Sequence, residues 1–439
     1  MILILYTKQY RKGSYQFQLA AETLKEEKLT NFSSKEVICL GIVTKNEFKK
    51  ILHHYQNIKE FHFFGHAGMY GPMFGTVSFP EQMSRAEWKD LKVDFSPDGR
   101  AYFLCCRSAR WFAPFFAHRY GVTTLGVYWY TTVSTKKNHF RWAIGERKKR
   151  KPLYIIGCPG KKSHGIIGSL VKYSGFAKAE ELKKFEPHPT EEESYDQVAA
   201  AYNEVFSDIN VRRDEMNWLN SIWPKNSDLS VLDIGCGNGA LLKELSGKIK
   251  EGTGVDNSST MIQLAKQNNI NNKNITFQKI TGPKLKLKDN SIDLIISMLS
   301  FRYLDWDPLV EELLRVIKEG GSIIIIDMVA KPVSFSEYGR FIISKLKTFL
   351  FQAKNRHFSL ALKKLVRSKQ WKQMVKYNPI REEHEILWYL TSRFPGIAVK
   401  KLNIGWNART IGFYTGPLNK QNAKKHLKNL PEMMEQGLE

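Results

Sequence analysis

The sequence is poor in cysteine and has no cysteine pair at a metal-binding or redox spacing. Its 439 residues include five cysteines, none of them in a CxxC arrangement: Cys39, Cys105, Cys106, Cys158 and Cys236. Such scattered cysteines indicate neither a zinc site nor a disulfide framework. We therefore expect no metal site, and reduced thiols in a cytoplasmic protein.

Long hydrophobic runs are also missing. No stretch approaches the ~18 to 20 uninterrupted apolar residues that a membrane-spanning helix needs. The apolar start, MILILY, is short and precedes the basic residues Lys8, Arg11 and Lys12, whereas a signal peptide carries its charges first. We read MILILY as a strand and expect a soluble, cytoplasmic protein, with contact to a membrane surface left open.

Acidic residues are scarce relative to basic ones. The chain has 67 Lys and Arg against 43 Asp and Glu, a formal net charge of +24. This balance favours nucleic acid, acidic membrane surfaces or phosphate-bearing ligands and does not choose among them. The run 147–151 (RKKRK) is typical of a solvated loop more than of a nucleic-acid patch.

One segment has no acidic residue at all between Glu337 and Glu382, while basic and apolar residues recur there at helical spacing. Within it, residues 341–376 predict helices that serve as a lid over a substrate, as a membrane-surface element or as an RNA-binding face. The plain alternative is a solvated helix packed on its domain. We favour a lid that also touches anionic lipid.

The length predicts two domains, with room for a third small unit, and 42% hydrophobic residues exclude disorder as the main state. Short β-rich runs alternate with helical patterns in two zones, so the expected fold class is α/β in both. The expected organisation is an α/β domain over 1–175, a charged linker over 176–194, a second α/β domain over 195–418 with a basic insertion at 331–380, and a solvated tail over 419–439.

A glycine-rich loop in the second domain carries the clearest functional signal. In SVLDIGCGNGALLKEL, a strand that contains Asp233 leads into Gly235, Gly237 and Gly239, after which a helix begins. Glycines let the backbone approach a ligand closely, and the helix start offers N–H donors. A second strand, GTGVD, ends in Asp256, where a carboxylate can accept both hydroxyls of a ribose. The alternative is that the glycines only make a tight turn.

Residues 195–328 resemble class I S-adenosylmethionine-dependent methyltransferases, and the resemblance extends to about residue 416. The matching motifs are the D-x-G-x-G-x-G loop, the lead-in YDQVAAAY, the strand DNSIDLIIS and the segment LLRVIKEGGSIIIID. The resemblance implies a Rossmann-like seven-stranded sheet and S-adenosylmethionine as cofactor. It places Asp256 on the ribose, and Asp233 with the glycine loop on the methionine moiety.

The same resemblance implies further cofactor contacts. Met298 and Leu299 flank the cofactor, and Tyr202 belongs to the lead-in helix that covers it. Thr281 stands where the family commonly has an Asp that contacts the adenine amine. Since Thr also accepts a hydrogen bond, we expect a weaker or differently oriented adenine contact.

The methyl acceptor is less well defined by the sequence. No NPPY-type tetrapeptide follows the fourth strand, which reads SMLSFRYLDW, so nucleobase and glutamine methylation are disfavoured and a nucleic-acid partner is not expected. Positioning of a nucleophile in line with the methyl group supplies much of the catalysis, so no acid or base is obligatory. Tyr303 and His384 are the candidate bases. We predict a small-molecule or lipid-like acceptor.

The first domain carries a second candidate site. The strand EFHFF leads to His66 and the strand AYFL to Cys105 and Cys106, so both reach the ligand edge of a parallel sheet. This arrangement resembles the caspase-like (clan CD) cysteine peptidases, which implies a His66–Cys106 dyad on a caspase-like sheet. The competing function is thus a cysteine peptidase or peptide-binding module with an accessory methyltransferase domain. The alternative is ordinary strand thiols and a turn histidine.

Overall fold

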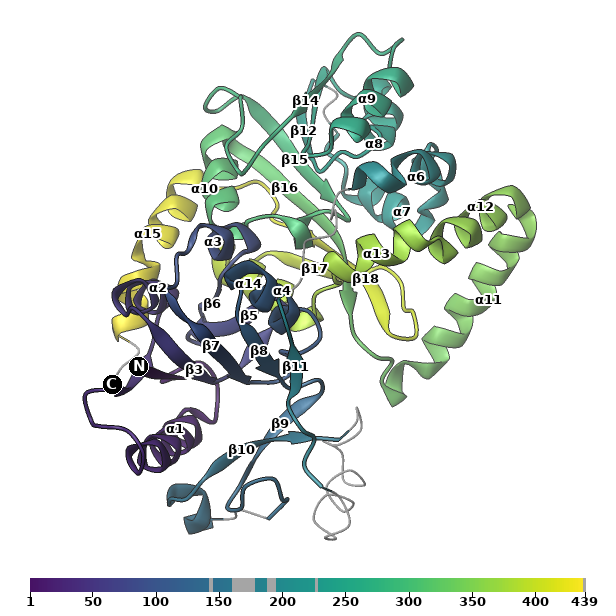
Figure 1. Ribbon diagram of the computed structural model, residues 1–439. Coiled ribbons are helices and arrows are strands. Elements are labelled where there is room, and N and C mark those ends of the chain that lie inside the picture. Colours follow the sequence, from purple (N-terminus) through teal and green to yellow (C-terminus); the bar gives the residue numbers. More distant parts are fainter. Residues whose placement is uncertain (142–144, 160–177, 188–194, 226–227, 437–439) are drawn as a thin grey trace. The chain divides into compact units, whose positions relative to one another are not determined.

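The computed structural model describes residues 1–141, 145–159, 178–187, 195–225 and 228–436 (Figure 1). The chain divides into two compact units. Unit 1 comprises Met1–Glu191 with Met434–Glu439, and unit 2 comprises Glu192–Met433. Each unit is built around its own α/β sheet, as the sequence predicts.

The main sheet of unit 1 has six strands. Five of these strands, β2, β1, β3, β7 and β8, are parallel to one another. The sixth strand, β11, lies at the edge beside β8 and is antiparallel to it. From one edge to the other the strands are β11 (Lys183–Phe185), β8 (Thr123–Gly126), β7 (Phe95–Leu104), β3 (Ile58–Phe64), β1 (Ile2–Thr7) and β2 (Val37–Ile42). The run MILILY therefore forms a strand, as the sequence predicts, and the structure places that strand inside the sheet, between β3 and β2.

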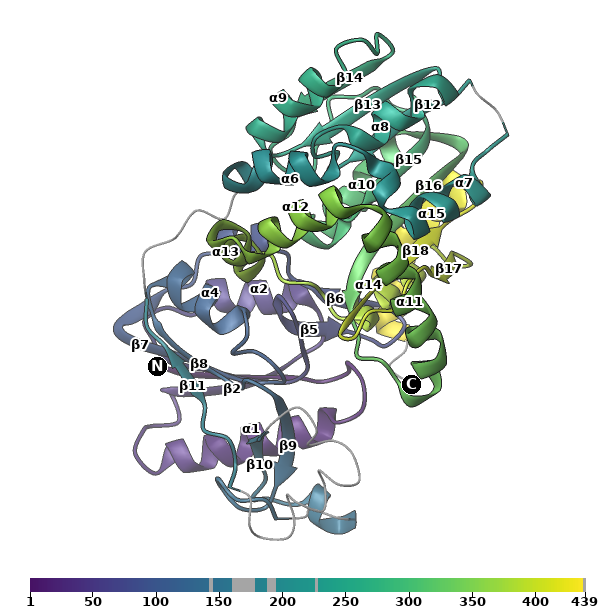
Figure 2. The same ribbon diagram turned by 90° about the vertical axis from the view of Figure 1, so that its right-hand side faces the viewer.

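Alternating side chains of these strands cover the two faces of the sheet. Leu3 and Leu5 pack with Phe63 beneath three helices, α2 (Lys45–His54), α3 (Arg85–Asp90) and α4 (Phe112–Tyr120). Ile2 and Ile4 point to the other face, where α1 (Ser14–Leu29) packs. Figure 2 shows α1 on the side of the sheet opposite to α2 and α4. The result is a three-layer α/β/α unit.

The structure corrects two expectations in unit 1. Residues 183–185 of the expected linker form the edge strand β11, because an edge strand bonds on one side only and tolerates charged, exposed side chains. The other described part of 176–194 contains no further strand, and residues 176–177 and 188–194 lie outside the description. The run LYIIG forms β10 (Tyr154–Cys158), which pairs with β9 (Tyr130–Ser134) and not with the main sheet.

Smaller elements complete unit 1. Strands β4 (Ala67–Gly68), β5 (Gly71–Gly75) and β6 (Pro80–Gln82) form a separate three-stranded sheet. The basic run enters the 3₁₀ helix η1 (Gly145–Lys149), whose side chains are exposed. Lys151 at its end pairs with Glu22 at 2.9 Å and with Glu26 at 2.7 Å on α1. Part of the run is therefore neutralised within the unit.

Unit 2 contains the predicted seven-stranded sheet. All strands are parallel except β18, which lies antiparallel between β16 and β17. In spatial order the strands are β14 (Ile275–Lys279), β13 (Glu251–Asp256), β12 (Ser230–Ile234), β15 (Ile292–Met298), β16 (Ile317–Ala330), β18 (Ala408–Tyr414) and β17 (Ala398–Lys401). The chain order reverses between β12 and β15, and such a switch point is where parallel α/β sheets bind their ligands.

Helices cover both faces of this sheet. One face packs against α10 (Trp306–Val316) and α14 (Glu383–Arg393). The other face packs against α7 (Arg213–Ile222), α8 (Ala240–Leu245) and α9 (Ser259–Asn268). The near-continuous aliphatic runs of β15 and β16 follow from this burial on both sides.

The basic insertion forms three helices, α11 (Tyr338–Lys354), α12 (Arg356–Arg367) and α13 (Lys369–Tyr377). Helix α12 packs on α6 (Ala199–Phe206) through a small apolar cluster that includes Leu365 and Phe206. This arrangement makes α12 and α13 part of the body of unit 2, while α11 contributes no buried side chain.

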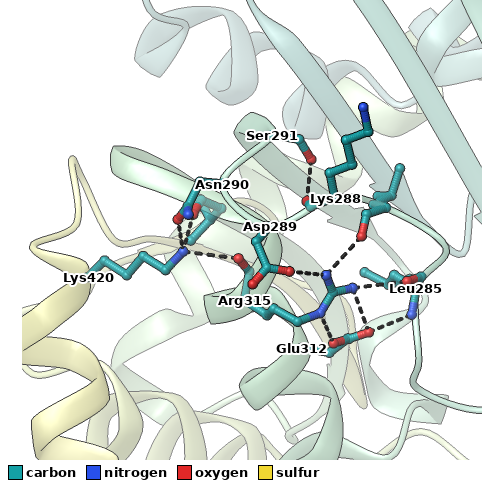
Figure 3. A network of polar contacts seen from close by, with 10 residues as sticks. Leu285, Lys288, Asp289, Asn290, Ser291, Glu312, Arg315 and Lys420 are labelled. Carbon is teal, nitrogen blue, oxygen red and sulfur yellow. Dashed lines mark hydrogen bonds and ion pairs between the residues drawn. The ribbon is translucent and has the colours of Figure 1, made fainter.

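The expected solvated tail is wrong for residues 420–436, which form helix α15 (Lys420–Gln436). Ala423 and Leu427, at helical spacing, pack against the core of unit 2. Lys420 is buried, and its Nζ donates to the carbonyl oxygens of Arg315 at 3.0 Å and Ile317 at 2.7 Å (Figure 3). The apolar face and this satisfied ammonium explain why the segment is ordered.

Candidate active site

The glycine loop joins β12 to α8 at the carboxyl edge of the sheet. Gly235, Gly237 and Gly239 all have positive φ, a conformation that favours glycine. A Cβ on Gly235 would lie 2.3 Å from the Cβ of Ser300, so the loop approaches the segment after β15 too closely for a side chain. A Cβ on Gly237 would meet nothing within 4 Å. The loop therefore leaves open space at the Cβ position of Gly237.

Asp256 ends β13 and ties this loop to the next one. Its Oδ2 accepts a hydrogen bond from the backbone N–H of Gly237 at 3.0 Å, and its Oδ1 accepts one from Ser258 N–H at 2.9 Å. Burial raises the pKa of Asp256, and these backbone hydrogen bonds counteract the effect. The carboxylate is thereby held in one orientation, and each oxygen keeps a lone pair for a ligand hydroxyl.

Asp233 lies on β12 directly before the loop and is buried. Burial, with a smaller contribution from the nearby Asp256, raises the pKa of the Asp233 carboxyl to about 8. A buried carboxylate in such surroundings is costly unless a cation or a hydrogen-bond donor pairs with it. The site therefore favours a ligand that brings a positive group to Asp233.

These residues fit S-adenosylmethionine. The two outer oxygens of Asp256 suit the vicinal hydroxyls of a ribose, and the buried Asp233 suits an α-ammonium group. The open space at Gly237 lets the backbone approach the ligand without a side chain between them. The roles that the sequence assigns to Asp256, Asp233 and the glycines stay predictions, and this geometry is compatible with them.

The lead-in segment is fastened to the same edge by a residue that sequence reasoning missed. Asp196 lies in the 3₁₀ helix η2 (Tyr195–Val198) and accepts hydrogen bonds from the hydroxyl of Ser258 and, at 3.2 Å, from Thr260 N–H. Both donors follow Asp256 closely in the chain. The only signal for Asp196 was its position in YDQVAAAY, where an acidic residue precedes the helix.

The four other residues that the sequence analysis expects to contact the cofactor lie at the end of β15, after β14 and on α6. Met298 ends β15, and Leu299 follows with a positive φ while its N–H donates to Ile326 O at 2.6 Å. Thr281 follows β14 at the same edge and is exposed. Tyr202 lies on α6, with its ring stacked on Trp371 of α13 at 6.5 Å. Tyr202 therefore links the lead-in helix to the basic insertion.

Tyr303, a candidate base, is joined to a tyrosine of the lead-in segment. The Tyr195 hydroxyl donates to the Tyr303 hydroxyl at 3.3 Å, across 108 positions of sequence. Burial raises the pKa of Tyr195 well above its usual value, so this phenol remains a neutral donor. Tyr303 follows β15 in η5 (Phe301–Tyr303), which places the pair at the carboxyl edge of the sheet.

A buried ion pair between Arg302 and Asp327 lies next to Tyr303. The backbone N–H of Arg302 donates to Asp327 Oδ2 at 2.7 Å, and its guanidinium pairs with Oδ1 of the same residue. That guanidinium lies 4.3 Å from the centroid of the Tyr303 ring. His384, the other candidate base, lies on α14 with its ring against Trp388. The structure thus links Tyr303 to the lead-in segment through Tyr195.

In unit 1, the two candidate dyad residues follow neighbouring parallel strands. Phe64 of β3 pairs in register with Leu104 of β7, and His66 and Cys106 each lie two positions beyond them. Cys106 Sγ contacts Thr131 Oγ1 at 3.3 Å, and His66 Nε2 contacts Lys12 O at 3.0 Å. Among the described residues, no hydrogen bond joins the histidine to the cysteine.

The comparisons with known proteins concern unit 2. Residues 232–325 match a family model described as a methyltransferase domain. Over 152 residues the chain is 30% identical to a phosphoethanolamine N-methyltransferase of Triticum aestivum, covering 34% of this chain and 30% of the wheat protein. Over 140 residues it is 27% identical to a demethylmenaquinone methyltransferase of Staphylococcus aureus (strain MRSA252), covering 28% of this chain and 58% of the staphylococcal protein.

A solved structure is similar as well. The phosphoethanolamine N-methyltransferase 1 of Haemonchus contortus, in complex with phosphoethanolamine and S-adenosylhomocysteine, is 22% identical over 31% of each chain, with a TM-score of 0.28. Unit 2 carries an S-adenosylmethionine-dependent methyltransferase domain, and S-adenosylmethionine is its cofactor. The match spans 30% of the wheat relative's length. In the part of the chain that the structure describes, no helix is both long and apolar enough to cross a bilayer.

Proposed function

We propose that the whole chain is a methyltransferase that transfers the methyl group of S-adenosylmethionine to a small-molecule or lipid-like acceptor. The observation that carries the proposal is the hydrogen bond that locks Asp256 onto Gly237, since it shapes a ribose site at the switch point of the sheet. The names of the wheat and staphylococcal relatives, one acting on phosphoethanolamine and one on demethylmenaquinone, agree with a small acceptor.

The bound cofactor would supply an electrophilic methyl group on sulfur. Asp256 would hold the ribose, Asp233 the ammonium group, and the backbone at Gly237 the space between them. Met298 and Leu299, at the end of β15, would flank the ligand. Thr281 would lie near the adenine, where its exposed hydroxyl suits a weak contact.

The Tyr195–Tyr303 pair would position the acceptor. Because Tyr195 donates its proton to the Tyr303 oxygen, the Tyr303 proton is directed elsewhere and can be donated to an acceptor heteroatom. Such a hydrogen bond would orient the acceptor while another lone pair of the same heteroatom attacks the methyl group in line. The methyl–sulfur bond would break as the new bond forms, S-adenosylhomocysteine would leave, and the acceptor's proton would pass to solvent. We therefore assign Tyr303 to positioning rather than to general-base chemistry.

Helices α12 and α13 would act as the lid over this edge. Trp371 of α13 stacks on Tyr202, and Leu365 of α12 packs with Phe206 on the lead-in helix. Movement of the lead-in helix during ligand exchange would then move the insertion with it. This packing agrees with the lid interpretation of the basic segment and equally with the plain alternative of a solvated helix packed on its domain.

The test combines ligand identification with label transfer. Mass spectrometry of small molecules retained by the purified chain should detect S-adenosylmethionine or S-adenosylhomocysteine. Methyl-labelled cofactor should then label a polar-metabolite extract or a lipid extract, and Asp256→Ala should lower the labelling roughly tenfold when the cofactor is below saturation. Exclusive labelling of RNA or DNA would contradict the proposal and favour a nucleic-acid methyltransferase.

A second candidate function rests on unit 1. We propose as an alternative that unit 1 is a caspase-like cysteine peptidase or peptide-binding module, with His66 and Cys106 as the dyad. The equivalent placement of these residues beyond β3 and β7 supports it, as does a sheet of five parallel strands closed by an antiparallel one. Burial lowers the pKa of His66, which keeps the imidazole neutral as a base requires.

A further inference from the structure

Helix α11 presents apolar side chains to solvent over its whole length. Ile342, Leu346 and Phe349 are 56%, 58% and 68% exposed, and their i, i+4 and i+7 spacing places them on one face of the helix. Ile343 and Leu350 are similarly exposed and widen the same stripe. Two turns of exposed aliphatic and aromatic side chains form a contiguous apolar surface, which marks an interaction site.

Aromatic side chains continue this surface at the N-terminal end of the helix. Phe335, 94% exposed, lies 6.2 Å from the Tyr338 ring, and Phe341 lies 5.6 Å from Trp406 on the loop before β18. Trp406 is itself more than half exposed. Tyrosine and tryptophan are the side chains that settle at the headgroup level of a bilayer.

The opposite face of α11 is the one that contacts unit 2. Phe351 packs against Phe358 of α12 at 5.8 Å and lies under the guanidinium of Arg213 at 5.5 Å. At the start of the helix, Glu337 pairs with the buried Arg409 at 2.7 Å, which lowers the pKa of Glu337. The helix is therefore anchored at its base and on one side, with its apolar stripe directed outward.

The charges of α11 are of one sign. Arg340, Lys345, Lys347 and Lys354 lie on the helix, and neither it nor α12 or α13 contains an acidic residue. Lys345 and Lys347 are exposed on either side of the stripe position Leu346. An apolar stripe flanked by cations is the pattern of a helix that lies in the plane of an anionic membrane surface.

We propose that α11, with Phe335 and Trp406 at its base, docks unit 2 on an anionic lipid bilayer. The inference rests on the proposed function in that it would bring the methyl-transfer edge to a lipid-like acceptor, although docking itself needs no methyl transfer. A second copy of the chain is a poorer occupant, because pairing two α11 stripes would bring Lys345 and Lys347 of both copies together. A bilayer satisfies the apolar stripe and the flanking cations at once.

The test is flotation of the full chain with vesicles, either of neutral phosphatidylcholine or of phosphatidylcholine with an anionic phosphatidylglycerol fraction. Binding should rise with the anionic fraction and fall with salt, because screened attraction weakens with ionic strength. The combined change Ile342→Ser, Leu346→Ser and Phe349→Ser should lower binding roughly tenfold or more, since the buried apolar area drives insertion. The matched control is Ile270→Ser, at a side chain that is 80% exposed outside α11.

The charge contribution has its own variant and control. Lys345→Gln, Lys347→Gln and Lys354→Gln combined should lower binding to anionic vesicles and flatten its salt dependence. The control removes three charges elsewhere, by Lys284→Gln, Lys286→Gln and Lys288→Gln, and should bind like the parent chain. All three control lysines are exposed.

Several outcomes would overturn the docking proposal. The first is that the parent chain does not bind anionic vesicles. The second is that the triple serine variant binds them as well as the parent chain does. The third is that the control variants lose as much vesicle binding as the α11 variants. RNA binding without flotation, or a dimer that the serine variant dissociates, would assign the stripe to another partner. Calorimetry with S-adenosylhomocysteine checks that each variant is folded and separates the two proposals. Vesicle binding without any methyl transfer would leave α11 assigned and reject the acceptor proposal.

Discussion

The backbone N–H of Gly237 donates to the carboxylate of Asp256 at 3.0 Å, so the glycine loop and the end of the neighbouring strand form one rigid unit. The two residues lie 19 positions apart and meet because β12 and β13 are parallel neighbours in register. Rigidity matters here because a preorganised carboxylate loses little entropy when a ribose binds.

Asp256→Ala should therefore weaken binding of S-adenosylhomocysteine by roughly tenfold or more, as expected when hydrogen bonds of about 1–3 kcal/mol are lost from a buried polar group. Calorimetry measures the affinity directly. Asp228→Ala is the control, since that carboxylate is exposed and precedes β12 at the other end of the strand. Equal affinities of the parent and Asp256→Ala would remove Asp256 from the site.

Binding should also depend on pH through Asp233. Its pKa of about 8 in the folded chain lies above the ~4 of an unfolded Asp, so the ligand-free site holds a proton at neutral pH. An ammonium group pairs with the carboxylate form, so affinity for S-adenosylhomocysteine should rise from about pH 6 to about pH 8 with release of a proton. Calorimetry in buffers of different ionisation enthalpy counts that proton.

The variant Asp233→Asn should bind roughly tenfold more weakly and lose both the pH dependence and the proton release. In the ligand-free chain, the pH dependence of folding stability has the opposite sign to the pH dependence of affinity. Between about pH 4 and about pH 8 the folded state binds more protons than the unfolded state, so stability should fall with rising pH, less steeply in Asp233→Asn. A parent chain with pH-independent affinity would show that Asp233 does not meet the cation.

Tyr303→Phe should lower the rate of methyl transfer roughly tenfold, because it removes one positioning hydrogen bond to the acceptor. Affinity for S-adenosylhomocysteine should be unchanged. Tyr195→Phe should show a smaller effect, since it only orients the Tyr303 hydroxyl. Label transfer from S-adenosylmethionine into an active extract measures the rates, with Tyr414→Phe on β18 as control. A rate unchanged in Tyr303→Phe would contradict the positioning role.

In unit 1, Cys106 should be alkylated by iodoacetamide ahead of the other thiols at neutral pH. Burial raises the pKa of Cys39 to about 11 and raises that of the buried Cys105 as well, so both should react slowly. His66→Ala should slow labelling of Cys106, and Cys106→Ala should leave methyl transfer unchanged. Peptide mapping after limited labelling identifies the sites. An inert Cys106, indifferent to His66, would end the peptidase hypothesis.

The geometry of the candidate cofactor site was largely predictable because its residues lie in short, contiguous motifs. The D-x-G-x-G-x-G loop and the strand that ends in Asp256 each carry their role locally, and the structure places them together through a standard parallel pairing. The fold class of both units and the closing strands before residue 416 followed from hydrophobic patterns of the same local kind.

Other features depended on contacts that no local pattern contains. The strand β11 has the charged sequence KKF, which by itself is typical of a linker. It forms a strand because its backbone pairs with the free edge of β8. The sequence of helix α15 predicts a solvated tail, yet Leu427 packs against the core of unit 2. The Lys420 ammonium donates to three oxygens of residues that lie more than a hundred positions earlier in the chain.

The sequence by itself determined the glycine-rich loop between a strand and a helix, the class of both sheets and the basic character of residues 341–376, because each is a property of neighbouring residues. Only the tertiary structure decided that Tyr195 meets Tyr303, that α12 and α13 pack on the lead-in helix and that α11 keeps its apolar stripe exposed. These outcomes depend on which helix faces find a partner, and burial against a distant element is a free-energy balance that composition alone does not contain.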